Sequence, residues 1–502
     1  MRLTPGVFWA ILLTAIPAAA AEEMLPADQV VQLPVQNDPT ISFRVWFKVG
    51  SQDDPPGKEG LAALTAAMLA NASTQKNSYA QVLEKLFPLA AGYEDSTSME
   101  MTVISGRVHK DNLKDYYPLL TEAILLPAFS QEDFERIRSD TLNYLQNILR
   151  YASDEELGKA VLYNEIFAGT PYGHIPAGLI ESVKGITRDD VRAFYRVHYT
   201  RENVVLGIGG GYDAALREKL RKDLARLPSE KPPVRSPPQP RPIRGLKVTI
   251  VEKDAPATAI SIGFPMDVLR GTKDWYALAV ANSWFGEHRN SSSHLYQVIR
   301  EARGLNYGDY SYIEHFPHGG QLQVPPQNVC RRRQIFEIWI RPVPNEARHF
   351  ALRAALREFQ HLVDHGMTAE EFTLTRNFLK KYVLHYAPTT TARLGYALDD
   401  RFYRIQGSHL ESFRKMMDEV TLEEVNAAIQ RHWQYGNMQI VIVTKDAKAL
   451  KEALVSDAPS PITYPTPKPE SVLSEDRQIS KFPLRVRAED VKIVPVAELF
   501  VK

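Results

Sequence analysis

The sequence predicts an α+β protein built from two tandem homologous domains, and three observations support this prediction. A polar, proline-rich segment, residues 227–245, divides the chain of 502 residues into halves of similar length. Segments of this kind act as semi-rigid, extended linkers between domains. Each half opens with a strand-like segment, continues with helix-like segments and closes with another strand. Segments of the second half also repeat segments of the first in the same order.

The strands expected at the ends of each half are rich in β-branched and aromatic residues. The opening strands are "ISFRVWFKVGS" from Ile41 and "ATAISIGFPM" from Ala257. The closing strands are "VVLGIGGG" from Val204 and "MQIVIVT" from Met438. A late helix precedes each closing strand, so both halves share one order of elements.

The repeat is clearest in that late helix. The segment "ITRDDVRAFYRVHYTREN" from Ile186 aligns without gaps with "VTLEEVNAAIQRHWQYGN" from Val420. Thr187 and Thr421 are each followed three residues later by an acidic residue, which is the order of a helix capping box. The repeat is too long for a solenoid, so it indicates a duplicated domain rather than a repeat array.

Breaks in composition predict the boundaries. A second proline-rich stretch begins at Ser456 and separates a C-terminal tail with short apolar alternations. We expect this tail to dock as a strand, either on its own domain or on a partner. The predicted segments are a signal peptide at 1–21, a first domain at 22–228, a linker at 229–245, a second domain at 246–457 and a tail at 458–502.

The first residues have the pattern of a secretory signal peptide. Arg2 gives a positive start, and residues 7–16 form an apolar core that is too short to span a bilayer. Small residues then lead to a predicted cleavage site near Ala21. We therefore expect an exported protein, periplasmic in a bacterium, without a membrane span after cleavage.

The charge balance limits the classes of partner. Lysine plus arginine and aspartate plus glutamate both number 60, so the formal net charge is zero. No global field favours nucleic acid or an anionic membrane. Cys330 is the single cysteine, which excludes an intramolecular disulfide. We interpret it as a stray thiol, and the adjacent arginines 331–333 as a solvated turn in preference to a site for an acidic partner.

The stretch "GLAALTAAML", residues 60–69, has the frame of a zinc-peptidase helix without its chemical groups. In the pattern GxAHxxEHML, two histidines at i and i+4 bind Zn²⁺ and the glutamate at i+3 is the general base. Here Ala63 and Ala67 stand at the histidine positions, and Ala66 stands at the glutamate position. Alanine supplies no ligand atom but is the best helix former. The helix is therefore expected to persist without zinc chemistry.

The chain resembles the M16 (insulinase, or pitrilysin-like) metallopeptidase family of the two-domain bacterial type. Resembling segments occur in order along it, from "VWFKVGSQDDPPGKEGLAAL" to "LYQVIREARGLNYGDYS" and "HGMTAEEFTLTRNFL". The resemblance implies two tandem α/β-sandwich domains of the M16/LuxS-like metallohydrolase fold, which together form a half-clamshell. It also places the family's distal glutamate ligand at Tyr144, or at Asn143 with a shift of one residue. Neither residue restores the zinc site.

The segment "REARGLNY" keeps a second family feature. The resemblance implies that Arg300 and Tyr307 reach the zinc site of an opposing domain and bind the substrate backbone near the scissile carbonyl. A guanidinium and a phenol suit that role, because both donate hydrogen bonds to an oxygen that gains charge in the transition state. The alternative is structural: Arg300 pairs with a local carboxylate, and Tyr307 fills the edge of a core.

These features predict a non-catalytic subunit of a heteromeric, periplasmic M16 zinc peptidase. The chain is not expected to be a peptidase by itself or to hold zinc, which we expect in an HxxEH-bearing partner. The substrate is expected to be a peptide added as a strand at a sheet edge. The alternative function is a scaffold or binding protein on a dead peptidase fold, as in the core subunits of the respiratory bc1 complex. An active peptidase with a relocated metal site is the third and weakest hypothesis.

Other motifs give weaker signals. The pairs His315/His318 and His288/His294 could bind zinc, but no carboxylate or cysteine set converges on them in the sequence. The glycine run at 207–211 lacks the acidic residue and the βαβ context of a dinucleotide site. We interpret the run as a flexible turn.

Overall fold

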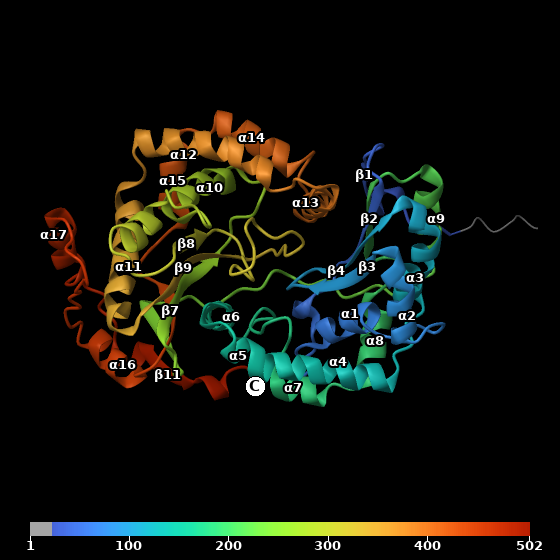
Figure 1. Cartoon of the computed structure of the whole chain (residues 1–502), viewed down its shortest axis with the longest axis horizontal. Helices are drawn as coiled ribbons and strands as arrows, with labels where there is room; N and C mark the ends of the chain where they lie inside the picture. The colour runs from blue at the N-terminus through green and yellow to red at the C-terminus, as the bar shows by residue number, and fades with distance from the viewer. Residues whose placement is uncertain (1–22) are drawn as a thin grey trace, which may run out of the picture.

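The computed structural model describes residues 23–502, so the predicted signal peptide lies outside the described residues. Two β-sheets, one in each half of the chain, lie side by side with helices packed around them (Figure 1). Residues 228–244, which join the halves, form neither helix nor strand. In the described part of the chain, no helix is both long and apolar enough to cross a membrane.

The first sheet has five strands in the order β1-β5-β2-β4-β3. Only the β1–β5 pair is parallel. The helices α1 (Leu61–Ala70) and α3 (Leu113–Leu125) pack on this sheet, and α8 (Arg188–His198) packs against α1. The strands are β1 (Val30–Pro34), β2 (Thr40–Phe47), β3 (Gly92–Thr97), β4 (Thr102–His109) and β5 (Val204–Gly210).

The second sheet has six strands in the order β11-β6-β10-β7-β9-β8. The helices α10 (Lys273–Gly286), α11 (Arg348–His365) and α15 (Leu422–His432) belong to this half and share its core. The strands are β6 (Leu246–Glu252), β7 (Ala257–Met266), β8 (Asp309–Tyr312), β9 (Gln334–Pro344), β10 (Met438–Thr444) and β11 (Val491–Pro495). The remaining helices are α2 (Tyr79–Leu86), α4 (Gln131–Asn143), α5 (Leu149–Tyr151), α6 (Asp154–Ile166), α7 (Ile180–Gly185), α9 (Ala214–Leu224), α12 (Ala369–Tyr382), α13 (Thr390–Tyr403), α14 (His409–Glu419), α16 (Ala447–Val455) and α17 (Glu470–Ile479).

The two halves exchange helices across their boundary. Helix α6 of the first half packs on β7 and β10 of the second sheet, and α13 of the second half packs on β1, β2 and β5 of the first. Figure 1 shows both helices in the region between the sheets. Every residue of β5 and of β10 is buried, because each of these strands has helices on both of its faces.

The glycine run is part of this exchange and is not the flexible turn that we predicted. Its first four residues lie in β5, directly under α13. A Cβ atom built on Gly207 would lie 2.6 Å from Cδ1 of Leu398, which belongs to α13. A larger residue at this position would have to displace the Leu398 side chain, so the glycine favours the close approach of this helix to the sheet.

The C-terminal tail docks on its own chain, which settles the alternative left open by the sequence. Strand β11 pairs in parallel with β6 and becomes the edge of the second sheet. The chain then crosses to the first half, where the backbone N–H groups of Ile180 and Glu181 donate to the carbonyls of Phe500 (2.8 Å) and Val501 (3.0 Å). The last residues thus bridge the two halves at the start of α7.

Candidate functional site

Helix α1 begins at a sharp turn that glycine makes possible. Gly60 has a φ of 106°, in the left-handed region that favours glycine. The backbone N–H groups of Gly60 and Ala62 each donate to the carboxylate of Asp54 at 2.7 Å. Asp54 therefore caps the helix, although burial raises the pKa of its carboxyl well above the usual range. Protein groups alone therefore cap the N-terminus of α1.

The three alanines at the predicted zinc and base positions all lie on helix α1. Ala63 and Ala67 are the two residues of α1 that are not fully buried, and they share one helix face, whereas Ala66 is buried. Tyr144, at the expected position of the distal ligand, begins a π-helical turn directly after α4, which packs against α1. Burial raises the pKa of the Tyr144 phenol, so the hydroxyl stays protonated.

These residues do not fit a zinc ion. Three alanines supply no donor atom, and a protonated phenol is a poor ligand for zinc, which is bound by imidazole, thiolate or carboxylate groups. Across residues 23–502, no group of three or more histidine, cysteine, aspartate or glutamate side chains is arranged to hold a metal ion. No zinc-dependent step can therefore be assigned to α1.

The histidine pairs considered from the sequence make structural contacts. Nδ1 of His288 lies 2.8 Å from the Tyr312 hydroxyl, and its Nε2 lies 2.9 Å from the Leu322 carbonyl oxygen. Nε2 of His294 lies 2.7 Å from Oε2 of Glu358. The ring of His315 packs edge-on against Tyr163. These three histidine rings therefore make structural contacts within the protein.

The arginine run is not a solvated turn, and the prediction was wrong on this point. Arg331 is fully buried, and its guanidinium packs against the rings of Tyr163, Phe167 and Tyr172. Arg332 forms an ion pair of 2.5 Å with Glu100 of the first half. The run therefore fastens the two halves together.

Cys330, beside this run, is buried, and its thiol is therefore poorly accessible to reagents in solution. Burial raises the pKa of its thiol well above the usual value, with a smaller contribution from the nearby Asp399 carboxylate. The reactive form of cysteine is the thiolate. The adjacent arginines do not make this thiol acidic, because desolvation has the larger effect.

Arg300 and Tyr307 lie on the two sides of a turn that leads into β8. Arg300 belongs to a π-helical turn, Tyr296–Glu301, and its Nη1 lies 3.0 Å from Oε2 of the exposed Glu301 side chain. Its guanidinium also lies over the Tyr296 ring, 5.5 Å from the ring centre. Tyr307 is 78% exposed and so does not fill a core edge.

A groove along the edge of the first sheet is a feature that the sequence did not reveal. Within the described chain, no strand pairs with the outer edge of β3. A groove of about 1040 Å³ reaches this strand, lined by residues of β2, β3 and β4, by the turn after α2 and by Thr391 of α13. Phe87, 87% exposed, stands in that turn. An unpaired edge beside an apolar turn is suited to accept an extended peptide.

Comparison with known proteins places the chain in a family. Residues 30–175 match the model of insulinase (peptidase family M16), and residues 185–379 match the model of the peptidase M16 inactive domain. An uncharacterized zinc protease of Streptomyces coelicolor is 24% identical over 341 residues, which are 66% of this chain and 69% of that protein. The non-peptidase homolog YmxG of Helicobacter pylori is 24% identical over 419 residues, 80% of this chain and 88% of that protein.

Solved structures show the same fold. The peptidase M16 inactive domain from Pseudomonas fluorescens has a TM-score of 0.71 at 23% identity, covering 83% of this chain and 95% of that one. The periplasmic protease PqqL from Escherichia coli has a TM-score of 0.66 at 14% identity, covering 91% of this chain and 49% of that one. The fold is that of a two-domain α+β metallopeptidase. The chain belongs to the M16 peptidase family, and it is a non-catalytic member, because alanines replace the zinc-site side chains on α1.

Proposed function

We propose that this chain is the non-catalytic subunit of a heteromeric M16 peptidase and closes a chamber with a zinc-bearing M16 partner. The observation that carries this proposal is that α1 keeps its helix, its capping by Asp54 and its packing. The residues at its zinc and base positions, Ala63, Ala66 and Ala67, carry no functional group. The similarity to inactive M16 domains supports this proposal.

The substrate in this proposal is an unfolded peptide bound by its backbone. The open edge of β3 and its groove offer one place for an added strand, which tolerates varied side chains because the pairing uses main-chain groups. Arg300 and Tyr307 would donate to the substrate near the partner's metal. The exposure of Tyr307 supports such a reach.

The location in this proposal is the periplasm. It is supported by the signal-like pattern at residues 1–21 and by the fold likeness to the periplasmic protease PqqL. A direct check is to fractionate cells that produce the full chain and to sequence the N-terminus of the exported form. Cleavage near Ala21 is the expected result, and a cytoplasmic chain that keeps its first residues contradicts the location.

The functional test uses the mature chain with an HxxEH-bearing M16 peptidase recovered by affinity co-purification. The chain alone should hydrolyse no peptide and hold no stoichiometric zinc, and the complex should do both. Arg300→Ala or Tyr307→Phe should lower kcat/KM of the complex by about 100-fold, the usual effect of losing a donor to a developing charge. Arg404→Ala and Tyr151→Phe are matched controls and should leave the activity unchanged.

The scaffold function is the second candidate, and the contact of Arg300 with Glu301 favours it, because this guanidinium already has a local partner. It predicts a stable complex whose peptidase activity is the same with or without this chain. Full activity of the complex with either Arg300→Ala or Tyr307→Phe would exclude the substrate-binding role and leave the scaffold function.

A further inference from the structure

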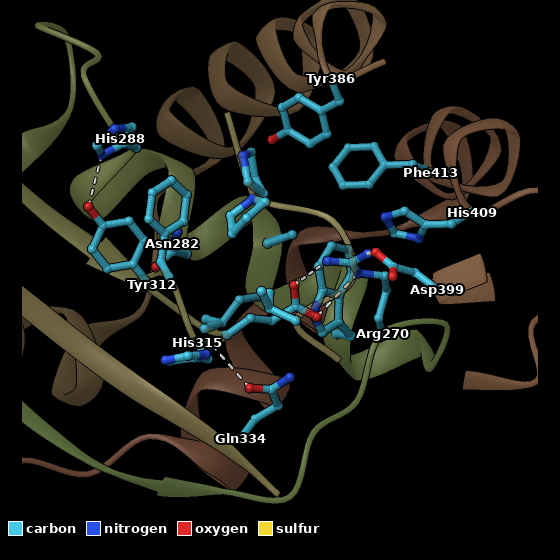
Figure 2. Close-up of a pocket in the computed structure, with 18 of the residues that line it drawn as sticks. Arg270, Asn282, His288, Tyr312, His315, Gln334, Tyr386, Asp399, His409 and Phe413 are labelled. Carbon is cyan, nitrogen blue, oxygen red and sulfur yellow. Dashed lines mark hydrogen bonds and ion pairs between the residues drawn. The ribbon is translucent and has the colours of Figure 1, made fainter. Parts of the chain in front are cut away.

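A partly enclosed cavity of about 80 Å³ lies inside the second half (Figure 2), and no residue of α1 lines it. It is bounded by α10, α12, α13, α14 and the segment that joins β8 to β9. Figure 2 shows Tyr386, Phe413 and His409 on one side of it and Asn282 and Tyr312 on another. Its wall combines aromatic rings with buried polar groups, which is the composition of a small-molecule site.

Three carboxyl groups, those of Glu287, Glu314 and Asp399, line the cavity with a single arginine, Arg270. Burial raises the pKa of Asp399 and raises that of Glu287 to about 7, so a cation that enters the cavity would stabilise their ionised forms. Arg270 pairs with Glu314 at 2.7 Å and with Asp399 at 3.2 Å, so one guanidinium faces two carboxylates. The histidines in the wall do not compensate this charge, because burial lowers the pKa of His288 to about 4 and that of His409 well below its usual value. An anionic ligand is therefore disfavoured and a cation is favoured.

The aromatic wall also suits a cation. The guanidinium of Arg270 itself lies over Trp275, Tyr396 and Tyr403, between 5.5 and 6.0 Å from the ring centres. Tyr386 and Phe413 offer further aromatic surface to the cavity. Rings in this arrangement attract positive charge through their negative faces.

Several polar atoms in the wall lack partners among the described residues. The indole N–H of Trp275 and the hydroxyl of Tyr396 are buried without a hydrogen bond, in side chains that are 6% and 2% exposed. Nδ1 of His315 and Oδ1 of Asn282 are in the same condition. Buried polar groups in folded proteins almost always have a partner. A matching ligand therefore carries an acceptor for the indole and phenol donors and a donor for the amide oxygen.

We propose that this cavity binds a small amino alcohol. Its ammonium group would face Oδ1 of Asn282 and the aromatic rings, and its hydroxyl oxygen would accept from the Tyr396 hydroxyl, with the Trp275 indole N–H as a second donor. A cavity of about 150 Å³ holds the six carbon atoms of benzene, so the space of about 80 Å³ suits a molecule of about three to four non-hydrogen atoms. This site is independent of the peptidase role proposed above.

Calorimetry of the full chain with ethanolamine, n-propylamine and ethylene glycol tests this proposal. Ethanolamine should bind at least about 10-fold more tightly than the other two probes, because n-propylamine lacks the acceptor and ethylene glycol lacks the charge. Tyr396→Phe should reduce ethanolamine affinity about 10-fold and leave n-propylamine affinity unchanged. The fold should tolerate this variant, because the lost hydroxyl has no partner in the described chain. Tyr435→Phe, an aromatic change outside the cavity, should alter neither affinity.

The contrary outcomes are equally clear. No ethanolamine binding, or ethylene glycol binding as tightly as ethanolamine, would show a cavity filled by water or by an adventitious additive only. Unchanged ethanolamine affinity in Tyr396→Phe and in Asn282→Ala would show that the amine binds elsewhere. Each of these results overturns the proposal, and thermal melts of both variants would confirm that they are folded.

Discussion

Ala63 and Ala67 are the two residues of α1 that the structure leaves partly exposed. They stand one helical turn apart, so side chains placed there would project to the same side. Ala66 lies in the buried interior, where a carboxylate would need a partner. Helix α1 therefore presents these two positions on one partly exposed side, where metal-binding side chains could be introduced.

This geometry predicts that two substitutions restore metal affinity. The double variant Ala63→His/Ala67→His should gain zinc-dependent stability, because imidazoles at i and i+4 bind one ion together. At zinc concentrations of 100 times the dissociation constant, the gain should be about 2.7 kcal/mol. Urea unfolding with and without zinc measures it. The single variant Ala63→His is the control, and an equal zinc response in both would show that the two positions do not share an ion.

Glu287 is a residue whose burial should appear in the pH dependence of stability. Burial raises the pKa of its carboxyl to about 7, so the folded chain binds a proton that the unfolded chain has released above its ordinary pKa. Stability from this group is complete at acidic pH and is lost as the pH rises towards 7. The free energy of unfolding, wild type minus Glu287→Gln, should fall by roughly 3 kcal/mol between pH 4 and 8.

Urea unfolding at a series of pH values, without added amine, measures this difference. The glutamine variant keeps the shape of the side chain and removes its titration. A difference between the two proteins that stays constant with pH would mean that the carboxyl is as well solvated in the folded chain as in the unfolded one.

At the scale of elements, the exchange of α6 and α13 fixes how the halves fit together. Gly158 lets α6 approach the second sheet, because a Cβ atom there would lie 3.3 Å from Oγ of Ser261. Gly207 does the same for α13 against the first sheet. In both cases a glycine faces the partner element, so small residues set the distance between helix and sheet.

The contact at β5 predicts the effect of one added methyl group. Gly207→Ala should destabilise the protein by about 1–3 kcal/mol, because its Cβ would overlap Leu398 and displace α13. Leu398→Ala is itself destabilising, but the loss in the double variant should be smaller than the sum of the two single losses, which a double-mutant cycle of unfolding free energies would detect. Gly185→Ala is the control, since nothing lies within 4 Å of a Cβ atom there. Additive losses in the double variant would contradict direct contact.

The repeat of late helices and closing strands was visible in the sequence, because local patterns carry it. Both capping boxes, at Thr187 and Thr421, are present in the structure as predicted. The roles of Arg331 and Gly207 were not visible, because they depend on contacts between residues far apart in the chain. Polarity indicated a solvated turn for Arg331, but three aromatic rings enclose it.

The candidate site likewise has features that the sequence predicted and features that it did not. The alanines of α1 could be placed from the sequence, because their spacing follows the helix period. The groove beside β3 could not be predicted, because it depends on which strand ends the sheet. Propensity does not reveal strand order, which is a property of the whole molecule.

At the scale of the whole molecule, the crossing of the C-terminal residues predicts the effect of a truncation. Deleting residues 499–502 removes the acceptors of the Ile180 and Glu181 amides but leaves β11 in place. Amide exchange at these two residues should become at least about 10-fold faster, while the strands of both sheets keep their protection. Hydrogen exchange with mass spectrometry measures this. Lys502→Ala is the control, and unchanged exchange at α7 in the truncated chain would mean that the crossing does not persist in solution.

The exchanged helices also determine when, during synthesis, the first sheet can bury both of its faces. The first sheet is complete once β5 has been synthesised, yet one of its faces waits for α13, which comes nearly two hundred residues later. Until then this face is an apolar surface in contact with solvent, which is a hazard for aggregation in larger proteins. In the export that we propose, the chain would avoid exposing this face if it stayed unfolded until α13 had crossed the membrane. For the same reason, either half produced alone should be poorly soluble.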